Sequence, residues 1–322
     1  MHIGEKGENL IFLISTPRSG STLLQQMLGG NPEVHTLPEP WIALPSLYTL
    51  YSRNIDRRHN TEYNLYWART AVKGFIEHLP GGEETYLSGI RKMYAHLYGS
   101  ALEGTGKKIF LDKGPRYFLI IPELYKVFPE AKYIILFRNP LAFLVSIFNR
   151  WGKGRYEVFS GFKPDLLEGG RRLIAGTSLL NGRAAVIKYE ELLDDTEKSL
   201  KDICGATGLR YDPVMMKYER KQKFDSSLGY QEQKEEYWSG AADSRNADKW
   251  ALSLRDPQLW RAADDYLRFL GSKLVEGMGY SYDGMKQVLA EHYPGRLKLL
   301  GTRSLFQIIR KGETEYMRKG MK

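Results

Sequence analysis

The sequence contains a single cysteine, Cys204, among 322 residues. One cysteine cannot form an intrachain disulfide or a cysteine-based metal cluster, and chains without disulfides are typical of reducing compartments. No apolar run approaches the roughly 18 residues of a membrane-spanning helix. The N-terminal segment also lacks the apolar core of a signal peptide. The sequence therefore predicts a cytoplasmic protein without a transmembrane segment.

Two common motifs for phosphates and metals are also missing. The G-x-x-x-x-G-K-[ST] loop that binds ATP phosphates does not occur. No spacing of histidine, cysteine and acidic residues matches a metal site. We therefore expect no metal requirement, and the missing loop counts against a kinase that uses ATP and magnesium.

Positive charge is unevenly distributed along the chain. The formal net charge is +9, and residues 286–322 hold nine basic but only three acidic residues. A nucleic-acid-binding protein would need basic residues clustered on its folded body, so we expect no nucleic-acid partner. The mixed apolar and basic segment 296–311 is interpreted as a helix docked on the body. The alternative is a contact with an anionic surface, such as a carrier protein or membrane headgroups.

Short apolar runs alternate with helical segments, which is typical of an α/β fold with a parallel sheet and helices on both faces. We expect one P-loop-like domain over residues 1–284, followed by a basic extension over 285–322. Its inserted parts are a helical acceptor-binding region at about 40–105 and a lid-like loop at about 219–249. The predicted strands are Leu10–Ser15, 107–111, 131–137 and Ala184–Lys188; the main predicted helices are 21–28, 116–128, 141–151, 194–205 and 257–278, and 152–170 is predicted to be irregular.

The turn after the first strand carries groups that bind anions. Residues 16–23 read TPRSGSTL, between a predicted strand and a predicted helix. Backbone N–H groups and the positive end of the helix dipole meet at such a turn, and Arg18 adds a fixed positive charge. Gly20 allows the backbone to approach a ligand closely. We expect a phosphate or sulfate site here, and assign to it Arg18, Ser19, Gly20, Ser21, Thr22 and Leu23.

A second anion-binding segment follows the strand predicted at 131–137. Residues 138–146 read RNPLAFLVS. Asn139 suits a helix N-cap and Pro140 the first helical position, so Arg138 ends the strand and Ser146 lies ~10 Å along the helix axis. This pair is expected to hold two sides of a second phosphate. The alternative is an arginine in a salt bridge and a serine bonded within its own helix.

Together, residues 16–23 and 138–146 resemble the nucleotide site of sulfotransferases that use 3′-phosphoadenosine 5′-phosphosulfate (PAPS). In that family the first segment holds the 5′-phosphosulfate, and the arginine and serine of the second hold the 3′-phosphate. Three further segments within residues 111–192 resemble the same family, and the resemblance implies that Tyr189 approaches the adenine. It also implies that PAPS is the donor and 3′,5′-adenosine bisphosphate (PAP) the product.

The loop indicates a branch of this family. Arg18 stands where cytosolic aryl and steroid sulfotransferases usually have lysine, and is more similar to the bacterial natural-product, carbohydrate and tyrosyl-protein branches. The late R-K-G phosphate clamp of the cytosolic branch is not evident. Arg245 and Lys249, within the segment 239–250, are the nearest candidates for that contact.

Sulfuryl transfer requires stabilisation of developing charge and a base for the acceptor hydroxyl. We assign the stabilisation to Arg18, Lys113 and the loop amides. Lys113 is expected at the carboxyl end of the sheet, just after the strand predicted at 107–111. The resemblance makes Glu39, held between two prolines, the first candidate for the base. His35 is the second, because the ordinary pKa of histidine near ~6.5 suits this task.

The sequence thus predicts in-line sulfuryl transfer from PAPS to a hydroxyl of a natural product, a carrier-bound hydroxyacyl chain or a sugar. A P-loop-like small-molecule kinase that uses ATP and magnesium is the alternative enzyme. A nucleotide-binding regulatory module is the alternative without catalysis. The positions of Lys113 and Glu39 separate these hypotheses, because both residues must converge near Arg18 in a sulfotransferase.

Overall fold

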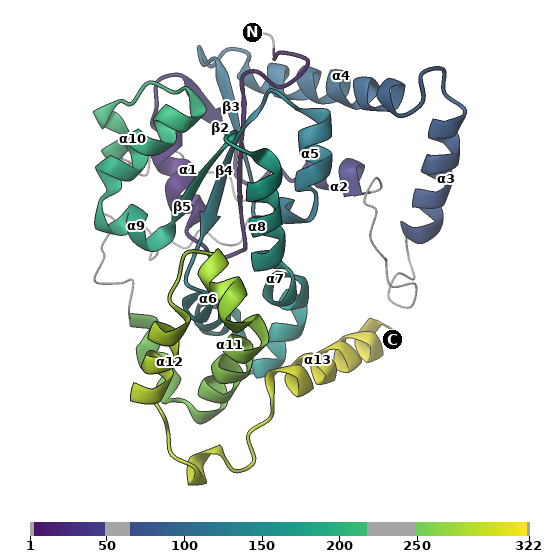
Figure 1. Cartoon of the computed structure of the whole chain (residues 1–322). Coiled ribbons are helices and arrows are strands. Elements are labelled where there is room, and N and C mark those ends of the chain that lie inside the picture. Colours follow the sequence, from purple (N-terminus) through teal and green to yellow (C-terminus); the bar gives the residue numbers. More distant parts are fainter. Residues whose placement is uncertain (1–2, 49–64, 218–248, 321–322) are drawn as a thin grey trace.

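The structure is a computed structural model that describes residues 3–48, 65–217 and 249–320. A central sheet carries helices on both faces, and further helices lie beyond one end of the sheet (Figure 1). Arg245 and nearly all of the predicted loop at 219–249 lie outside the described residues; Lys249 is inside them.

Five parallel strands form the sheet, in the order β2-β3-β1-β4-β5. Their bounds are β1 Leu10–Ser15, β2 Val34–Thr36, β3 Ile109–Gly114, β4 Lys132–Phe137 and β5 Ala184–Lys188. β1, β3 and β4 are almost wholly buried, because central parallel strands are covered on both faces. The predicted parallel α/β sheet is confirmed. β2 is missing from the prediction, since three residues are too short to show a period.

The strand predicted at 107–111 is shifted in the structure. β3 begins at Ile109 and continues through Asp112 and Lys113 to Gly114. The two charged residues are only 0% and 1% exposed, so they belong to the sheet and not to the turn after it. The apolar run in the sequence stops before these two residues, because charged residues are rarely buried unless they are paired. The predicted strand therefore ends too early.

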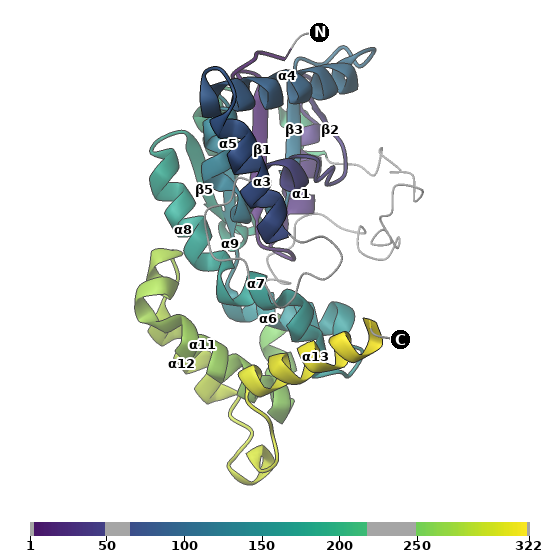
Figure 2. The same cartoon turned by 90° about the vertical axis from the view of Figure 1, so that its right-hand side faces the viewer.

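The sheet divides the hydrophobic core into two layers. Helices cover both faces of the sheet (Figure 2). The helices around the sheet are α1 Ser21–Gly29, α2 Ala43–Tyr48, α3 Leu65–Glu77, α4 Gly82–Leu102, α5 Ile121–Val127, α8 Gly169–Leu180, α9 Tyr189–Asp194 and α10 Thr196–Thr207. Alternate side chains of β1 enter opposite layers: Leu13 packs with α1 and α10, whereas Phe12 packs with α4, α5 and α8. The helices predicted within 40–105 are confirmed in the described part of that region.

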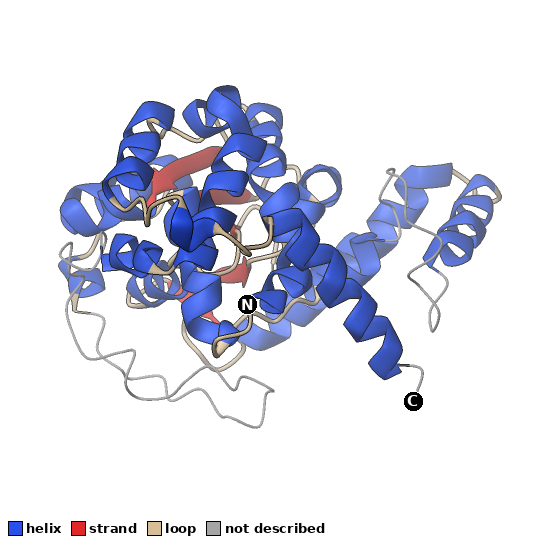
Figure 3. Cartoon of the chain, turned by 90° about the horizontal axis from the view of Figure 1, so that it is seen from below, coloured by secondary structure: helices blue, strands red, loops and turns tan. Residues whose placement is uncertain are grey.

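A further group of helices lies beyond the carboxyl ends of the strands (Figures 1 and 3). It comprises α6 Pro140–Ile147, α7 Lys163–Leu167, α11 Pro257–Gly277, α12 Tyr282–Glu291 and α13 Leu305–Gly320. α6 begins as predicted, because the Asn139 side chain accepts hydrogen bonds from the N–H groups of Leu141 and Ala142, and Pro140 occupies the first turn.

Two predictions in this layer need correction. The helix predicted at 141–151 ends as an α-helix at Ile147 and continues as a π turn over Phe148–Gly152. Residues 152–170 are not irregular: they contain a 3₁₀ helix, Tyr156–Phe162, and then α7. Of the glycines that suggest a loop, only Gly154 has a positive φ. A Cβ atom at Gly152, Gly169 or Gly170 would lie within 2.8 Å of a neighbouring side chain, so these glycines allow close packing.

The C-terminal helix is docked on the body. α13 packs against the 3₁₀ helix Tyr156–Phe162, with Leu305 and Ile308 fully buried. The Lys163 Nζ lies 2.7 Å from a carboxylate oxygen of Glu313. The docked helix interpreted at 296–311 is confirmed only from Leu305 onward; the preceding residues, 296–304, contain a single 3₁₀ turn and no α-helix.

The described residues can be searched for membrane-spanning helices, metal ligands and cysteine contacts. None of their helices is long and apolar enough to cross a bilayer. No three of their His, Cys, Asp and Glu side chains are grouped so as to hold a metal ion. Cys204 is buried beside Met215, and burial raises the pKa of its thiol to about 11.

Candidate active site

The turn between β1 and α1 is fixed by its own side chains. Arg18 and Gly20 both adopt left-handed backbone conformations, with φ of 61° and 88°. The hydroxyl of Ser19 is buried and hydrogen-bonds with that of Thr16, 2.8 Å apart. The Ser19 hydroxyl, which the sequence assigns to the ligand, is thus directed toward Thr16 within the turn. Ser21 is buried, whereas Thr22 and Leu23 are partly exposed at the start of α1.

Gly20 meets two requirements at once. Its φ of 88° is unfavourable for a residue with a side chain. A Cβ atom at this position would lie 2.2 Å from a ring carbon of Tyr189, the first residue of α9. The glycine therefore allows the backbone to approach Tyr189, in addition to the approach of a ligand that the sequence suggested.

The two predicted anion-binding segments meet in space. Arg138, which follows β4, donates a hydrogen bond from Nη1 to the backbone carbonyl of Arg18. Arg18 Nε lies 3.4 Å from the Ser146 hydroxyl, on α6. The Arg138 guanidinium stacks over the Tyr189 ring at 4.8 Å. Four of the residues assigned to the nucleotide thus form one cluster at the carboxyl ends of β1 and β4.

This cluster has the electrostatics of an anion site. Arg138 Nε is buried and has no hydrogen-bond partner among the described residues. Burial lowers the pKa of Arg138, and the charge of Arg18 acts in the same direction, opposed by Tyr189 and Glu190. A buried donor left unpaired costs free energy, and an anion between the arginines would satisfy it. The residues therefore fit a phosphate group.

A second cluster surrounds Lys113. Its Nζ forms an ion pair with Glu39 Oε1 and lies 3.2 Å from the Thr22 hydroxyl on α1. The Lys113 side chain is 2% exposed and that of Glu39 is 14% exposed. Lys113 therefore joins Thr22, within the segment 16–23, to Glu39. The convergence of both residues near Arg18 stays a prediction.

The segment around Glu39 is tightly held. Glu39 and Trp41 both have positive φ values, 29° and 52°, which are rare for residues with side chains. The Trp41 indole N–H donates to Glu39 Oε2 at 3.1 Å. Gln25 of α1 donates to the carbonyl of Leu37 at 2.8 Å. Such strain is typical of functional sites, where surrounding contacts hold the backbone in place.

Asp112, which the sequence analysis did not single out, supports this segment from the other face of β3. The hydroxyls of Tyr98 and Tyr117 both donate to Asp112 Oδ2, while Oδ1 is buried and has no partner in the described part of the chain. Burial raises the pKa of Asp112 to about 6, although both hydrogen bonds and Lys113 act to lower it. The backbone N–H of Ala43 lies 3.4 Å from the Tyr117 hydroxyl. Asp112 thus connects β3 and α4 with the chain just after Glu39.

His35 lies elsewhere. It pairs with Phe110 in the sheet, and the two rings meet edge to face at 5.8 Å. Paired residues of neighbouring strands share a face, so His35 faces the layer opposite to that of Lys113, which follows Phe110 by three residues. Burial lowers the pKa of His35, and Lys107 adds to that effect. The structure brings Glu39 but not His35 to Lys113.

The structure also shows contacts in the site that the sequence analysis did not predict. Trp151, in the π turn after α6, lies under the Arg18 guanidinium at 5.5 Å. Glu190 accepts hydrogen bonds from the Asn139 N–H and from the Tyr280 hydroxyl, which ties α9 to the turn after Arg138. Lys249 is exposed and makes no hydrogen bond or ion pair with the described residues. Sequence motifs do not reveal such partners, because they depend on which helices pack together.

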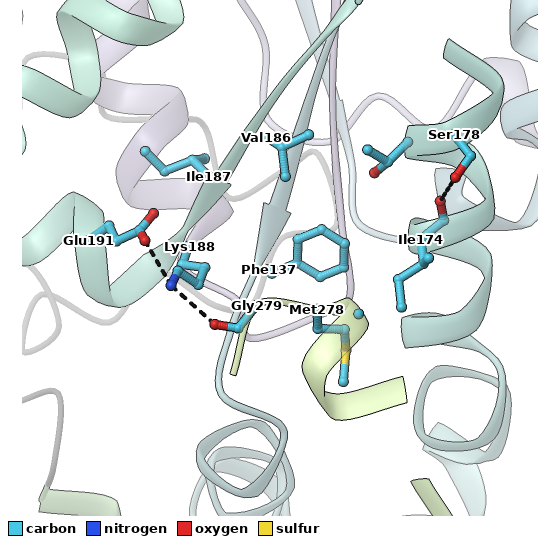
Figure 4. Close-up of a pocket in the computed structure, with 11 residues that line it drawn as sticks. Phe137, Ile174, Ser178, Val186, Ile187, Lys188, Glu191, Met278 and Gly279 are labelled. Carbon is cyan, nitrogen blue, oxygen red and sulfur yellow. Dashed lines mark hydrogen bonds and ion pairs between the residues drawn. The ribbon is translucent and has the colours of Figure 1, made fainter. Parts of the chain in front are cut away.

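A groove of about 330 Å³ lies outside this cluster (Figure 4). It is lined by residues of β5, α8 and the end of α11, among them Val186, Ile174 and Met278. In Figure 4 the Lys188 amine lies between Glu191 and the carbonyl of Gly279, so its charge is already paired. The groove is therefore not the anion site.

Comparisons with known proteins find relatives of this chain. A family model described as the sulfotransferase family matches residues 10–213. Nodulation protein NoeE of Sinorhizobium fredii (strain NBRC 101917 / NGR234) is 26% identical over 296 residues, which cover 84% of this chain and 66% of NoeE. The chain thus spans slightly less than two thirds of that relative.

Two further proteins are similar over most of their length. A putative protein-tyrosine sulfotransferase of Caenorhabditis briggsae is 21% identical over 271 residues, covering 82% of this chain and 88% of the relative. The structure of the sulfotransferase domain from the curacin biosynthetic pathway has 20% sequence identity and a TM-score of 0.48, and covers 74% of this chain and 89% of that domain.

Proposed function

The chain belongs to the sulfotransferase family, and we propose that it transfers a sulfuryl group from PAPS to an acceptor hydroxyl by in-line displacement and releases PAP. One observation carries the choice of donor: Arg138 contacts the turn that contains Arg18 and keeps a buried Nε without a partner. PAPS supplies the sulfuryl group and two phosphate positions. The residues present suit both phosphates, with no metal ion invoked.

Arg138, Ser146 and Tyr189 form the half of the site that we assign to the 3′-phosphate and the nucleoside. Arg138 Nε would donate to a phosphate oxygen, and the Ser146 hydroxyl beside Arg18 supplies a second donor. Tyr189 holds the Arg138 guanidinium by stacking. Arg245 and Lys249 stay candidates for an additional contact.

Lys113 and Glu39 form the half that we assign to the reacting group and the acceptor. Glu39 would take the proton of the acceptor hydroxyl as the new S–O bond forms. Lys113 and Arg18 would stabilise charge on the sulfuryl and leaving oxygens. The ion pair of Lys113 with Glu39 keeps that carboxylate oriented toward the loop. A natural-product hydroxyl, a carrier-bound hydroxyacyl chain and a sugar hydroxyl are the acceptor classes that we propose.

The location of this reaction is also a proposal. The single cysteine, Cys204, is buried and has no disulfide partner. This state suits a reducing compartment, and we place the reaction in the cytoplasm. We treat residues 1–284 as one catalytic domain with the basic extension attached to it.

Thermal stabilisation by nucleotides tests the proposed donor. A nucleotide at 100 times its Kd stabilises the folded state by roughly 2.7 kcal/mol. We expect a rise in melting temperature with PAP, and no comparable rise with ADP or ATP–Mg²⁺ at equal concentrations. A rise with ATP–Mg²⁺ alone would overturn the choice of donor and favour the kinase hypothesis.

A further inference from the structure

The chain between α12 and α13 forms a narrow projection at the lowest point of Figure 1. Its only regular element is a single 3₁₀ turn, Leu297–Leu299. Leu297 is 82% exposed and Leu300 is 72% exposed. These are the two most exposed large hydrophobic side chains among the residues that the structure describes. We call residues 296–300 the tip.

The exposure of the leucines does not come from a frayed chain. The base of the projection is anchored by Gln258 of α11, whose side chain exchanges two hydrogen bonds with the backbone of Arg303, at 2.8 and 2.9 Å. Arg303 also forms an ion pair with Glu157 at 3.0 Å. Leu299 turns inward and packs against the core, and its carbonyl accepts a 2.8 Å hydrogen bond from the Thr302 hydroxyl. The two neighbouring leucines are thus held outward.

Charge at the tip is of one sign. Arg296 and Lys298 alternate with the leucines, and no acidic residue occurs between Glu291 and Glu313. Neither basic side chain forms a hydrogen bond or an ion pair with the described residues. By contrast, Arg303 and Lys311, nearer the body, both pair with Glu157. The uncompensated charge therefore lies beside the exposed leucines.

We propose that the tip binds the surface of an anionic lipid bilayer. Leu297 and Leu300 would enter the boundary between headgroups and acyl chains, and Arg296 and Lys298 would contact lipid phosphates. A convex projection with apolar side chains at its end fits a planar, fluid surface. An acidic protein would need a pocket shaped around the same projection. Two leucines and two bases provide reversible binding and not a permanent anchor.

Vesicle binding by the full chain tests this proposal without an acceptor or a nucleotide. The probes are sedimenting vesicles of phosphatidylcholine alone and of phosphatidylcholine with about one third phosphatidylglycerol. We expect binding to the anionic vesicles only, and weaker binding as salt is added. The double variants Leu297→Ser/Leu300→Ser and Arg296→Glu/Lys298→Glu should each weaken binding by about tenfold or more.

Matched variants separate the tip from the general positive charge of the protein. Leu179→Ser/Leu252→Ser removes two leucines that are 43% and 54% exposed elsewhere. Lys73→Glu/Lys92→Glu, on α3 and α4, changes the net charge as much as the tip charge reversal. We expect both controls to stay within about threefold of wild type. Equal losses in tip and control variants would overturn the proposal.

A second readout keeps Leu300 and both basic residues of the tip in place. Cys204 is buried, so a polarity-sensitive dye on Leu297→Cys reports from the tip. Its emission should shift to the blue when anionic vesicles are added. No shift, or a shift with soluble polyglutamate and none with vesicles, would overturn the proposal; the latter result would indicate an acidic protein as the partner.

Discussion

The two halves of the candidate site balance their charges differently. On one side, two arginines approach each other, and Arg138 keeps a buried donor without a partner. On the other side, Lys113 is paired with Glu39 and is nearly inaccessible to solvent. The first arrangement is suited to capture an anion and the second to position a carboxylate. Under the proposed function, the comparison assigns affinity for the nucleotide and chemistry at the acceptor to separate sets of residues that both contact the segment 16–23.

Both halves hold a residue with a side chain in a left-handed conformation. Arg18 has a φ of 61° and Glu39 a φ of 29°. Such conformations cost of order 1–3 kcal/mol each and persist only where the surroundings fix them. Hydrogen bonds from Arg138 and from Trp41 contribute to that fixation. A variant in one half should therefore leave the function proposed for the other half, PAP binding or turnover, open to separate measurement.

The largest effect is expected in the half that contains Glu39. Glu39→Gln keeps the shape of the side chain but removes the proposed base, so turnover should fall by ~10²–10⁴. The measurement is PAP release with an acceptor that the wild type uses. His35→Gln distinguishes the two candidate bases: with Glu39 as base, its turnover should stay within about threefold of wild type. A large loss in His35→Gln and none in Glu39→Gln would reverse the assignment.

Asp112, behind the same half, gives a pH-dependent effect on stability. Burial raises its pKa to about 6, from 3.8, so between these values the folded state binds a proton that the unfolded state releases. The contribution of Asp112 to the free energy of unfolding therefore falls as pH rises from 3.8 to about 6 and is constant above that. The total fall is roughly 3 kcal/mol.

Asp112→Asn removes this titration and keeps an acceptor for both tyrosine hydroxyls. Urea unfolding of wild type and variant across the same pH range isolates the effect, because the other carboxylates cancel in the difference. We expect the stability of the wild type, relative to the variant, to decrease by roughly 3 kcal/mol from low to neutral pH. A difference that does not change with pH would show that Asp112 titrates normally.

A smaller effect is expected in the half that contains Gly20. Gly20→Ala places a methyl group against the Tyr189 ring at a positive φ, so unfolding should become easier by about 1–3 kcal/mol. Affinity for PAP should also fall, since Tyr189 stacks on Arg138. Gly205→Ala, in α10 with open space around it, is the matched control and should be neutral or stabilising by up to about 1 kcal/mol. Equal destabilisation by both changes would remove the special role of Gly20.

Much of the fold is readable from the sequence because strands and helices here have distinct patterns. β1 and β5 have the predicted bounds, and Asn139 caps α6 as expected. The meeting of Arg18 with Arg138 also follows from the sequence, because parallel strands bring their carboxyl ends to one edge of the sheet. The resemblance of residues 16–23 and 138–146 to sulfotransferases identifies which two strand ends meet.

Other parts of the site depend on packing that a single sequence does not reveal. His35 belongs to β2, a strand too short to detect in the sequence, and its face is set by its pairing with Phe110 of β3. Trp151 reaches Arg18 because the helix after Ser146 changes to a π turn. The role of Asp112 depends on two tyrosine hydroxyls, one of them from α4. Each case involves partners distant in sequence and without a motif.

The affinity of PAP for two variants tests the separation of the halves most directly. Arg138→Met removes the unpaired donor, and we predict that calorimetry will show a Kd about 10- to 150-fold weaker than that of wild type. Glu39→Gln should bind PAP within about twofold of wild type, because its half handles the acceptor. Equal weakening in both variants, or unchanged affinity in Arg138→Met, would contradict the assignment of nucleotide binding to the arginines.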